Sequence, residues 1–200
     1  MALMTEVGAA SAANGRSPVT LLFAAEAAPT AGGAVKGRPF HGRDLRKGRY
    51  SQAGQIYLIT TVTRNREKLF RFFPQGGDGA DLAFENARVV VRALRRIEEC
   101  GMAQTLAYVL MPDHLHWLLT LDDANELSTA VGRMKGATAR EMNLLMSRQG
   151  QPVWQKGFHD HAIRGEEDIR DVARYMVANP LRAGLVKHVG DYPWWDAVWL

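Results

Sequence analysis

The first strongly patterned stretch of the chain is residues 55–64, which read QIYLITTVTR. β-Branched and aromatic side chains dominate it, and they favour extended backbone, so we predict a strand. From Leu82 to Glu99, apolar residues return every three or four positions, which predicts an amphipathic helix ending near Gly101. The segment between them, Phe73 to Asp81, contains one proline and three glycines and is predicted to be a loop.

Two short apolar runs follow, Thr105–Leu110 and His114–Leu121. Only Met111-Pro112-Asp113 separates them, so we predict two antiparallel strands joined by a tight turn. Helical spacing returns over Leu127–Met146, and Gly150 to Pro152 interrupts it. Along these segments the spacing of apolar residues is therefore typical of strands in some and of helices in others.

The last patterned part of the chain begins with Val153–Ile163, which is predicted to be extended. A helix is predicted over Glu166–Asn179, with three acidic residues in its first turn, where the helix dipole favours negative charge. Pro180 disfavours helical backbone at the residue before it, so the helix should end at Asn179. The order strand, helix, two strands, helix, strand, helix predicts an α+β fold with a mostly antiparallel sheet.

The chain divides into two regions by composition. Residues 1–37 are rich in alanine, glycine, serine and threonine and show no sustained period, and a basic segment follows at residues 41–50. Such a sequence does not bury enough apolar surface to fold. We therefore expect a flexible, low-complexity and basic leader at residues 1–49 and one folded domain at residues 50–200.

The overall composition narrows the class of protein. Of 200 residues, 46% are hydrophobic and 23% are charged, which is typical of a globular domain. The single cysteine, Cys100, excludes an intrachain disulfide and a cysteine-based zinc site, and it favours a reducing compartment. Apolar runs fall short of the ~20 residues that span a bilayer, so we expect a cytoplasmic protein with no membrane partner.

Positive charge is concentrated in one part of the sequence. The net charge is +4, but residues 36–71 hold ten basic and two acidic residues, so the remainder of the chain carries −4. A basic segment can follow a nucleic-acid backbone or remain a solvated tail. The residues that we predict to contact DNA are Arg43, Arg46, Lys47, Arg49, Arg64 and Arg66, with Lys135 and Arg140 on the second predicted helix.

Two histidines give the first indication of chemistry. His114 and His116 share one face of the predicted strand, with Cβ atoms about 7 Å apart, so their rings can tilt toward one cation. Two imidazoles are too few for a structural zinc site. Tyr175 and Asn179 are neighbours on one helix face. Taken alone, each of these residues is more often structural: a packed histidine, a packed tyrosine or a helix terminator.

Two longer motifs resemble those that define the REP-associated tyrosine transposases. They are YVLMPDHLHWLL at Tyr108–Leu119 and RYMVANPLRAGLV at Arg174–Val186. This group belongs to the IS200-like transposases of the HUH single-strand endonuclease superfamily, in which two histidines flank a bulky apolar residue, here His114-Leu115-His116. The likeness extends over Tyr50–Trp195 and includes three further segments: Gln55–Thr63, Met134–Asn143 and Val153–His161.

The resemblance implies a fold, an activity and roles for particular residues. It implies a ferredoxin-like antiparallel sheet with helices packed on it, and a C-terminal helix that carries the nucleophile Tyr175. His114 and His116 would be ligands of Mg²⁺ or Mn²⁺, with Asn179 in the position of a third polar ligand. The substrate would be single-stranded DNA that folds as palindromic repeat hairpins, cleaved and rejoined through a 5′-phosphotyrosine. Apart from the resemblance, Asp113 could orient a histidine or a bound water, or be only a turn residue after Pro112. His159 and His161 are expected to be structural or DNA-orienting residues near the site.

Several alternatives remain at this stage. A domesticated hairpin-binding protein would bind the same DNA without cleaving it, and a metal phosphoesterase that uses water would not need Tyr175. The aromatic residues near the C-terminus either stack on bases or, as we expect, cap the core; they are Tyr192, Trp194, Trp195 and Trp199. The sequence leaves both a monomer and a homodimer open.

Overall fold

The computed structural model describes residues 54–71, 78–122, 126–164 and 168–199, with the side chains of residues 78–81 excepted. The leader predicted at residues 1–49 lies outside these ranges. In chain order the elements are β1 (Ile56–Val62), η2 (Arg64–Arg66), α1 (Asp78–Glu99), β2 (Ala103–Met111), β3 (His114–Leu121), α2 (Leu127–Leu145), β4 (His159–Ala162), α3 (Ile169–Val177), α4 (Asn179–Arg182), η3 (Val189–Asp191) and β5 (Trp195–Ala197).

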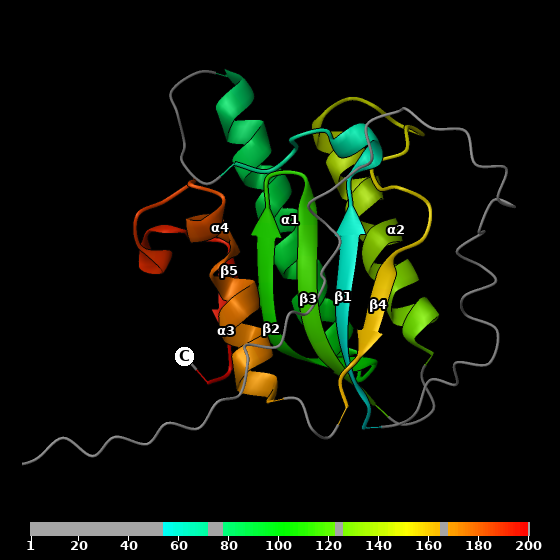
Figure 1. Ribbon diagram of the computed structural model, residues 1–200. Helices are drawn as coiled ribbons and strands as arrows, with labels where there is room; N and C mark the ends of the chain where they lie inside the picture. The colour runs from blue at the N-terminus through cyan, green and yellow to red at the C-terminus, as the bar shows by residue number, and fades with distance from the viewer. Residues whose placement is uncertain (1–53, 72–77, 123–125, 165–167, 200) are drawn as a thin grey trace, which may run out of the picture. The chain divides into compact units, whose positions relative to one another are not determined.

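The five strands form one antiparallel sheet in the order β4-β1-β3-β2-β5 (Figure 1). The first four strands and the helices α1 and α2 follow the order βαββαβ, which is the ferredoxin-like arrangement. The short strand β5 extends the sheet beyond β2. The predicted α+β fold is confirmed, and the turn between β2 and β3 contains only Pro112 and Asp113.

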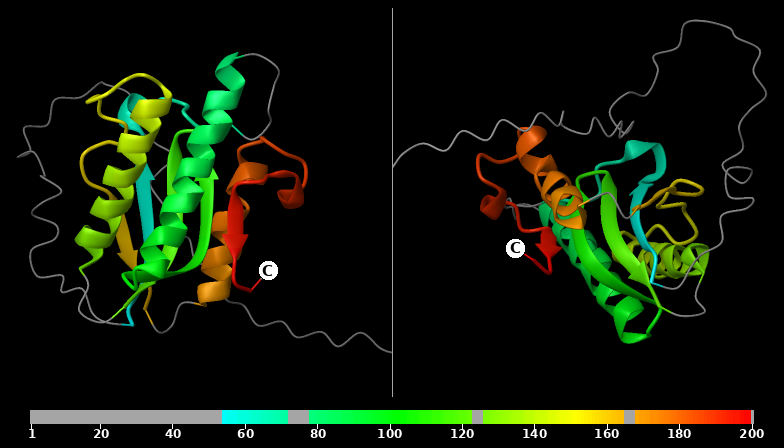
Figure 2. Two further views of the ribbon diagram at one scale, coloured as in Figure 1. Left: turned by 180° about the vertical axis from the view of Figure 1, so that it is seen from behind. Right: turned by 60° about the horizontal axis from the view of Figure 1, so that its bottom comes forward.

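Helices lie on both faces of the sheet. Helices α1 and α2 cover one face, and α3 lies on the other, where it contacts β2 and β5 (Figures 1 and 2). Most of the large buried side chains fill the layer between the sheet and α1 and α2, for example Ile59, Leu94, Leu115 and Trp117. The face under α3 is therefore the one that can hold a site next to the sheet.

Of the four aromatic residues near the C-terminus that were expected to cap the core, Tyr192 and Trp194 are buried in it, whereas Trp195 and Trp199 are half-buried. Tyr192 is 2% exposed, and its hydroxyl donates to the carbonyl of Leu110 at 2.6 Å. The Trp194 indole donates to the carbonyl of Arg71 at 2.6 Å, and its ring centroid lies 4.8 Å from that of Phe84. These contacts fix the end of the chain against β2 and α1.

Helix α1 corrects one predicted boundary. It begins at Asp78, so the last four residues of the loop predicted over Phe73–Asp81 are helical.

The third predicted helix is divided in the structure. Helix α3 begins after Asp168, whose side chain accepts from the backbone amide of Arg170 at 2.8 Å, and it ends at Val177. Asn179 does not terminate it but starts α4, so this prediction was wrong. Pro180 lies in the first turn of α4, where its missing N–H removes no helical hydrogen bond.

The predicted extended segment Val153–Ile163 is only partly a strand. Trp154 forms an isolated bridge with Thr63, and β4 begins at His159. Among the described residues, none of the helices combines the length and apolarity needed to cross a bilayer.

Candidate functional site

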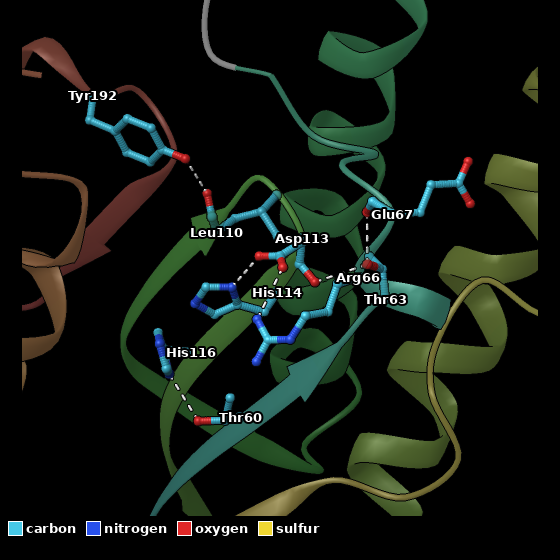
Figure 3. A network of polar contacts seen from close by, with 9 residues as sticks. All are labelled: Thr60, Thr63, Arg66, Glu67, Leu110, Asp113, His114, His116 and Tyr192. Carbon is cyan, nitrogen blue, oxygen red and sulfur yellow. Dashed lines mark hydrogen bonds and ion pairs between the residues drawn. The ribbon is translucent and has the colours of Figure 1, made fainter. Parts of the chain in front are cut away.

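The candidate site lies where β3 begins. His114 and His116 follow the β2–β3 turn directly, and strand alternation puts both rings on the side of β3 away from α1 (Figure 3). Their centroids are 4.8 Å apart and their planes are nearly perpendicular, at 86°. His116 is 8% exposed and the side chain of His114 is 17% exposed. The two imidazoles therefore meet edge to face in a largely desolvated position.

Each imidazole is held through the same ring nitrogen. Nδ1 of His114 lies 2.5 Å from Oδ1 of Asp113, and Nδ1 of His116 lies 2.9 Å from Oγ1 of Thr60 (Figure 3). Within the described part of the chain, Nε2 of neither ring has a hydrogen-bond partner. Both Nε2 atoms are therefore the positions from which this pair can bind something else.

Asp113 is itself fixed on its second oxygen. Nη1 of Arg66 lies 3.2 Å from Oδ2 of Asp113. Arg66 and its neighbour Asn65 both have positive φ, 53° and 55°, which is uncommon for residues with a side chain. The hydroxyl of Thr63 lies within hydrogen-bonding distance of the carbonyls of Glu67, at 2.7 Å, and Asp113, at 3.0 Å, and so ties this turn to the β2–β3 turn. This turn, whose backbone is strained, thus places the Arg66 side chain beside Asp113.

The charges of the site follow from burial and hydrogen bonding. The pKa of His116 is lowered to about 3, mainly by burial and in part by the neighbouring His114, while Asp113 acts in the opposite direction. The hydrogen bond from His114 is the main cause that lowers the pKa of Asp113, and Arg66 adds to it. At neutral pH the site therefore combines an ionised carboxylate with a neutral His116 ring, which has one ring nitrogen able to act as a ligand.

Tyr175 lies on the surface of α3. It is 41% exposed, whereas the buried stripe of this helix consists of Val172, Ala173, Met176 and Val177. The guanidinium carbon of Arg182 lies 4.2 Å from the centroid of the Tyr175 ring. Helices α3 and α4 both contact β2, the strand next to β3. Tyr175 is thus partly exposed on a helix that contacts β2, the strand next to the histidine strand.

Asn179 and the second histidine pair lie on two different elements, α4 and β4. Asn179 is half-buried at the start of α4. On β4, His159 pairs with Thr60, which also pairs with His116. Directly paired residues project from the same face of an antiparallel sheet. His159 and His161 therefore share the face of His114 and His116, with β1 lying between the two pairs.

The basic residues predicted to contact DNA have different surroundings. Arg64 and Arg140 are exposed. Arg66 pairs with Asp113, as described above, and the ammonium of Lys135 donates to the carbonyls of Gln155 at 2.7 Å and Gly157 at 2.5 Å. Four predicted residues lie outside the described ranges: Arg43, Arg46, Lys47 and Arg49.

The donor set of the site matches a partly ligated cation. Imidazole nitrogens suit Mn²⁺ or a similar transition metal, whereas Mg²⁺ prefers oxygen ligands and keeps several waters. Among the described residues, no group of three or more histidine, cysteine, aspartate or glutamate side chains is arranged to hold a metal. The two imidazoles thus suit a cation that takes its other ligands from water or from a substrate phosphate.

Sequence reasoning missed Thr60, which was counted only as part of a strand. Its contact with His116 depends on the pairing register of β1 and β3. The one available signal was a pair of adjacent threonines, Thr60 and Thr61, in an otherwise apolar strand. That signal does not say which side chain the hydroxyl meets, because the partner is 56 residues away in the sequence.

Comparison with known proteins finds similarity to transposases. Residues 83–179, which include both histidines, Tyr175 and Asn179, match the family model described as Transposase IS200 like. A REP-associated tyrosine transposase of Escherichia coli (strain K12) is 25% identical over 146 residues, covering 72% of this chain and 78% of that protein. A putative REP-associated tyrosine transposase of Haemophilus influenzae is 28% identical over 100 residues, covering 46% of this chain and 57% of that protein.

A solved structure described as a REP-associated tyrosine transposase bound to a REP hairpin shares the fold. Its TM-score is 0.57 with 24% identity, and the match covers 74% of this chain and 79% of that one. Sequence motifs, sheet order and family match therefore agree. Residues 83–179 of this chain are thus similar to the IS200-like transposases, and the chain as a whole is similar to the REP-associated tyrosine transposases.

Proposed function

We propose that this protein cleaves and rejoins single-stranded DNA at palindromic repeat hairpins, with Tyr175 as the nucleophile. The observation that carries the proposal is the arrangement of His114 and His116, whose Nδ1 atoms are both held while both Nε2 atoms remain available. Strand transfer needs a nucleophile as well as a cation site, and the exposed Tyr175 on helix α3 would be that nucleophile. The relative from Escherichia coli and the hairpin-bound structure support DNA hairpins as the substrate class.

The reaction follows from the chemistry of a phenol and a phosphodiester. Oη of Tyr175 attacks the phosphorus, the P–O3′ bond breaks, and the 3′ oxygen leaves with the bonding electrons and takes up a proton. The phenol proton passes to solvent, and the products are a 5′-phosphotyrosine and a free 3′-hydroxyl. The phosphorus remains a diester, so a second 3′-hydroxyl can reverse the step without ATP. Catalysis of such a transfer depends mainly on positioning and on neutralising charge.

The residues around the reacting groups have separable roles in this proposal. His114 and His116 would hold Mg²⁺ or Mn²⁺ through Nε2, with Asn179 as a third ligand. A cation bound there would polarise the scissile phosphate and neutralise charge in the transition state. Arg182, which lies against the Tyr175 ring, adds positive charge beside the nucleophile. Burial keeps His116 neutral and therefore competent as a ligand.

The DNA-binding surface would use exposed basic residues. Arg64 and Arg140 are exposed, and further basic residues precede the described part of the chain. Contacts of this kind release counterions, so the logarithm of the hairpin affinity should fall linearly with the logarithm of the salt concentration. Bases that are not paired in the hairpin would be bound by stacking and backbone contacts.

The test is a denaturing gel of the full-length protein incubated with a labelled hairpin oligonucleotide and Mn²⁺. We expect a covalent protein–DNA adduct with the wild type and with Tyr57→Phe, a control on the opposite sheet face. Tyr175→Phe should form no adduct but bind the hairpin with unchanged affinity. Binding without cleavage by the wild type would instead indicate a silent hairpin-binding protein. Cleavage that persists in Tyr175→Phe would indicate hydrolysis by water. Either outcome contradicts the proposal.

A further inference from the structure

We propose that Thr60 and Asp113 are positioning residues that keep the ring proton of His116 and of His114 on Nδ1, and that Arg66 braces Asp113 for this purpose. The proposal deepens the proposed function and rests on it, because it assigns a role toward the same cation. It concerns three side chains that would not touch the substrate or the metal themselves.

The argument starts from the two forms of a neutral imidazole. Such a ring carries one N–H, and only the other nitrogen has a lone pair that can bind a metal. Asp113 is ionised and can only accept, so at 2.5 Å Nδ1 of His114 must carry the proton. The lone pair of His114 is therefore on Nε2. The carboxylate thus selects the ring form that a metal ligand requires.

Thr60 acts on His116 in the same sense. Its hydroxyl is 2.9 Å from Nδ1, and it can accept from an Nδ1–H. In the opposite ring form the proton would sit on Nε2, which has no hydrogen-bond partner among the described residues. A cation bound at Nε2 requires that nitrogen to have the lone pair, so the proton of the neutral ring must then lie on Nδ1, where the Thr60 hydroxyl is in place to accept it. Thr60 thus favours at His116 too the ring form that a metal ligand requires.

Both contacts are rigid because the backbone fixes them. Thr60 lies directly opposite His116 in the β1–β3 register, and a β-branched side chain has few rotamers in a strand. Asp113 lies next to His114 in the β2–β3 turn, and Arg66 holds its second oxygen at 3.2 Å. Arg66 reaches it from a turn with positive φ at two successive residues. Strain of this kind persists where the surrounding structure fixes a functional geometry.

The first test measures Mn²⁺ affinity of the metal-free protein from the electron paramagnetic resonance signal of unbound Mn²⁺. Thr60→Val removes the hydroxyl but keeps the shape, and we expect it to weaken Mn²⁺ binding by about 10- to 100-fold. Thr60→Ser keeps the hydroxyl and should stay close to the wild type. Thr61→Val is the matched control, because Thr61 points to the opposite face and its hydroxyl has no partner among the described residues. Wild-type affinity in Thr60→Val would overturn the role of Thr60.

Asp113 and Arg66 are tested in the same way. Asp113→Ala should weaken Mn²⁺ binding by a similar factor, and Arg66→Ala by a smaller one, because Asp113 would still face His114. An exposed arginine elsewhere, in the variant Arg140→Ala, is the control for the loss of one positive charge. Equal Mn²⁺ affinity in Asp113→Ala and the wild type would overturn the role of Asp113.

The second test reads the ring protons directly and needs neither metal nor DNA. ¹⁵N chemical shifts of the histidine rings distinguish the two neutral forms. In the metal-free wild type we expect the proton of His116 on Nδ1, and in Thr60→Val a mixture of both forms. A proton on Nε2 in the wild type would overturn the proposal even if the protein binds Mn²⁺. If the wild type binds no Mn²⁺, the metal part of the proposed function fails, and the ring forms still decide whether Thr60 and Asp113 position the histidines.

Discussion

Lowering the pH from 7 to 5 should destabilise the folded protein through the buried ring of His116. This residue is 8% exposed, and burial lowers its pKa from 6.5 to about 3. In the unfolded chain the ring returns to its ordinary pKa of about 6.5 and takes up a proton in this range, while the folded protein does not. The stability from the neutral ring is therefore fully present above pH 6.5 and is lost as the pH falls toward 3.

The size of the effect follows from linkage between protonation and folding. One pKa unit corresponds to about 1.4 kcal/mol. Protonation of the ring stabilises the unfolded chain by about 0.2 kcal/mol at pH 7 and by about 2 kcal/mol at pH 5. We therefore expect the free energy of unfolding to fall by roughly 2 kcal/mol between these two values. Asp113 does not contribute here, because its pKa is lowered from 3.8 and it is ionised in both states.

The assay is urea unfolding at pH 5, 6 and 7 at constant ionic strength, followed by the fluorescence of buried tryptophans such as Trp117. His116→Gln should lose most of the pH dependence, whatever its absolute stability. His188→Gln is the control, because that side chain is 83% exposed and its loss should leave the dependence intact. A dependence that is the same in His116→Gln and in the wild type would refute the reasoning.

Three further predictions concern other parts of the molecule. Tyr192→Phe leaves the buried carbonyl of Leu110 without its 2.6 Å hydrogen bond, so the free energy of unfolding should fall by about 1–3 kcal/mol in denaturant titrations; no change would mean that another donor reaches this carbonyl. Thr61→Val removes a buried hydroxyl that has no partner among the described residues, so thermal melting should occur at the same or a higher temperature. A lower melting temperature would show that the hydroxyl is paired after all. Arg140→Ala should leave the melting temperature unchanged and reduce the slope of log affinity for the hairpin against log salt by about one. An unchanged slope would remove Arg140 from the DNA-binding surface.

The sequence was informative wherever structure depends on near neighbours. The boundaries of β3 were predicted to the residue, because its apolar run begins directly after a proline-containing turn. The helix over Leu82–Glu99 was recognised from its period. Its true start at Asp78 was missed, because glycine and proline nearby dominated the local pattern. At Asn179 the rule for residues before proline predicted an end, but proline is also favoured in a first helical turn, and that second preference prevailed.

For the candidate site, too, the sequence was informative about features that depend on near neighbours. Strand alternation alone puts His114 and His116 on one face. Helical spacing predicted Tyr175 and Asn179 on one helix face, but α3 ends at Val177 and Asn179 belongs to α4. The family resemblance added proposed roles to these residues. None of these inferences needed to know which strands are neighbours.

What the sequence by itself determined was therefore the set of elements, the face of each side chain and the motifs that carry the family likeness. Only the tertiary structure decided that Thr60 faces His116, that Arg66 holds Asp113, and that the ammonium of Lys135 binds backbone carbonyls. The physical reason is that strand register and long-range contacts are selected by the packing of the whole domain. A shift of one residue would reverse the faces of β1, and no local pattern specifies the partner of a side chain 56 residues away.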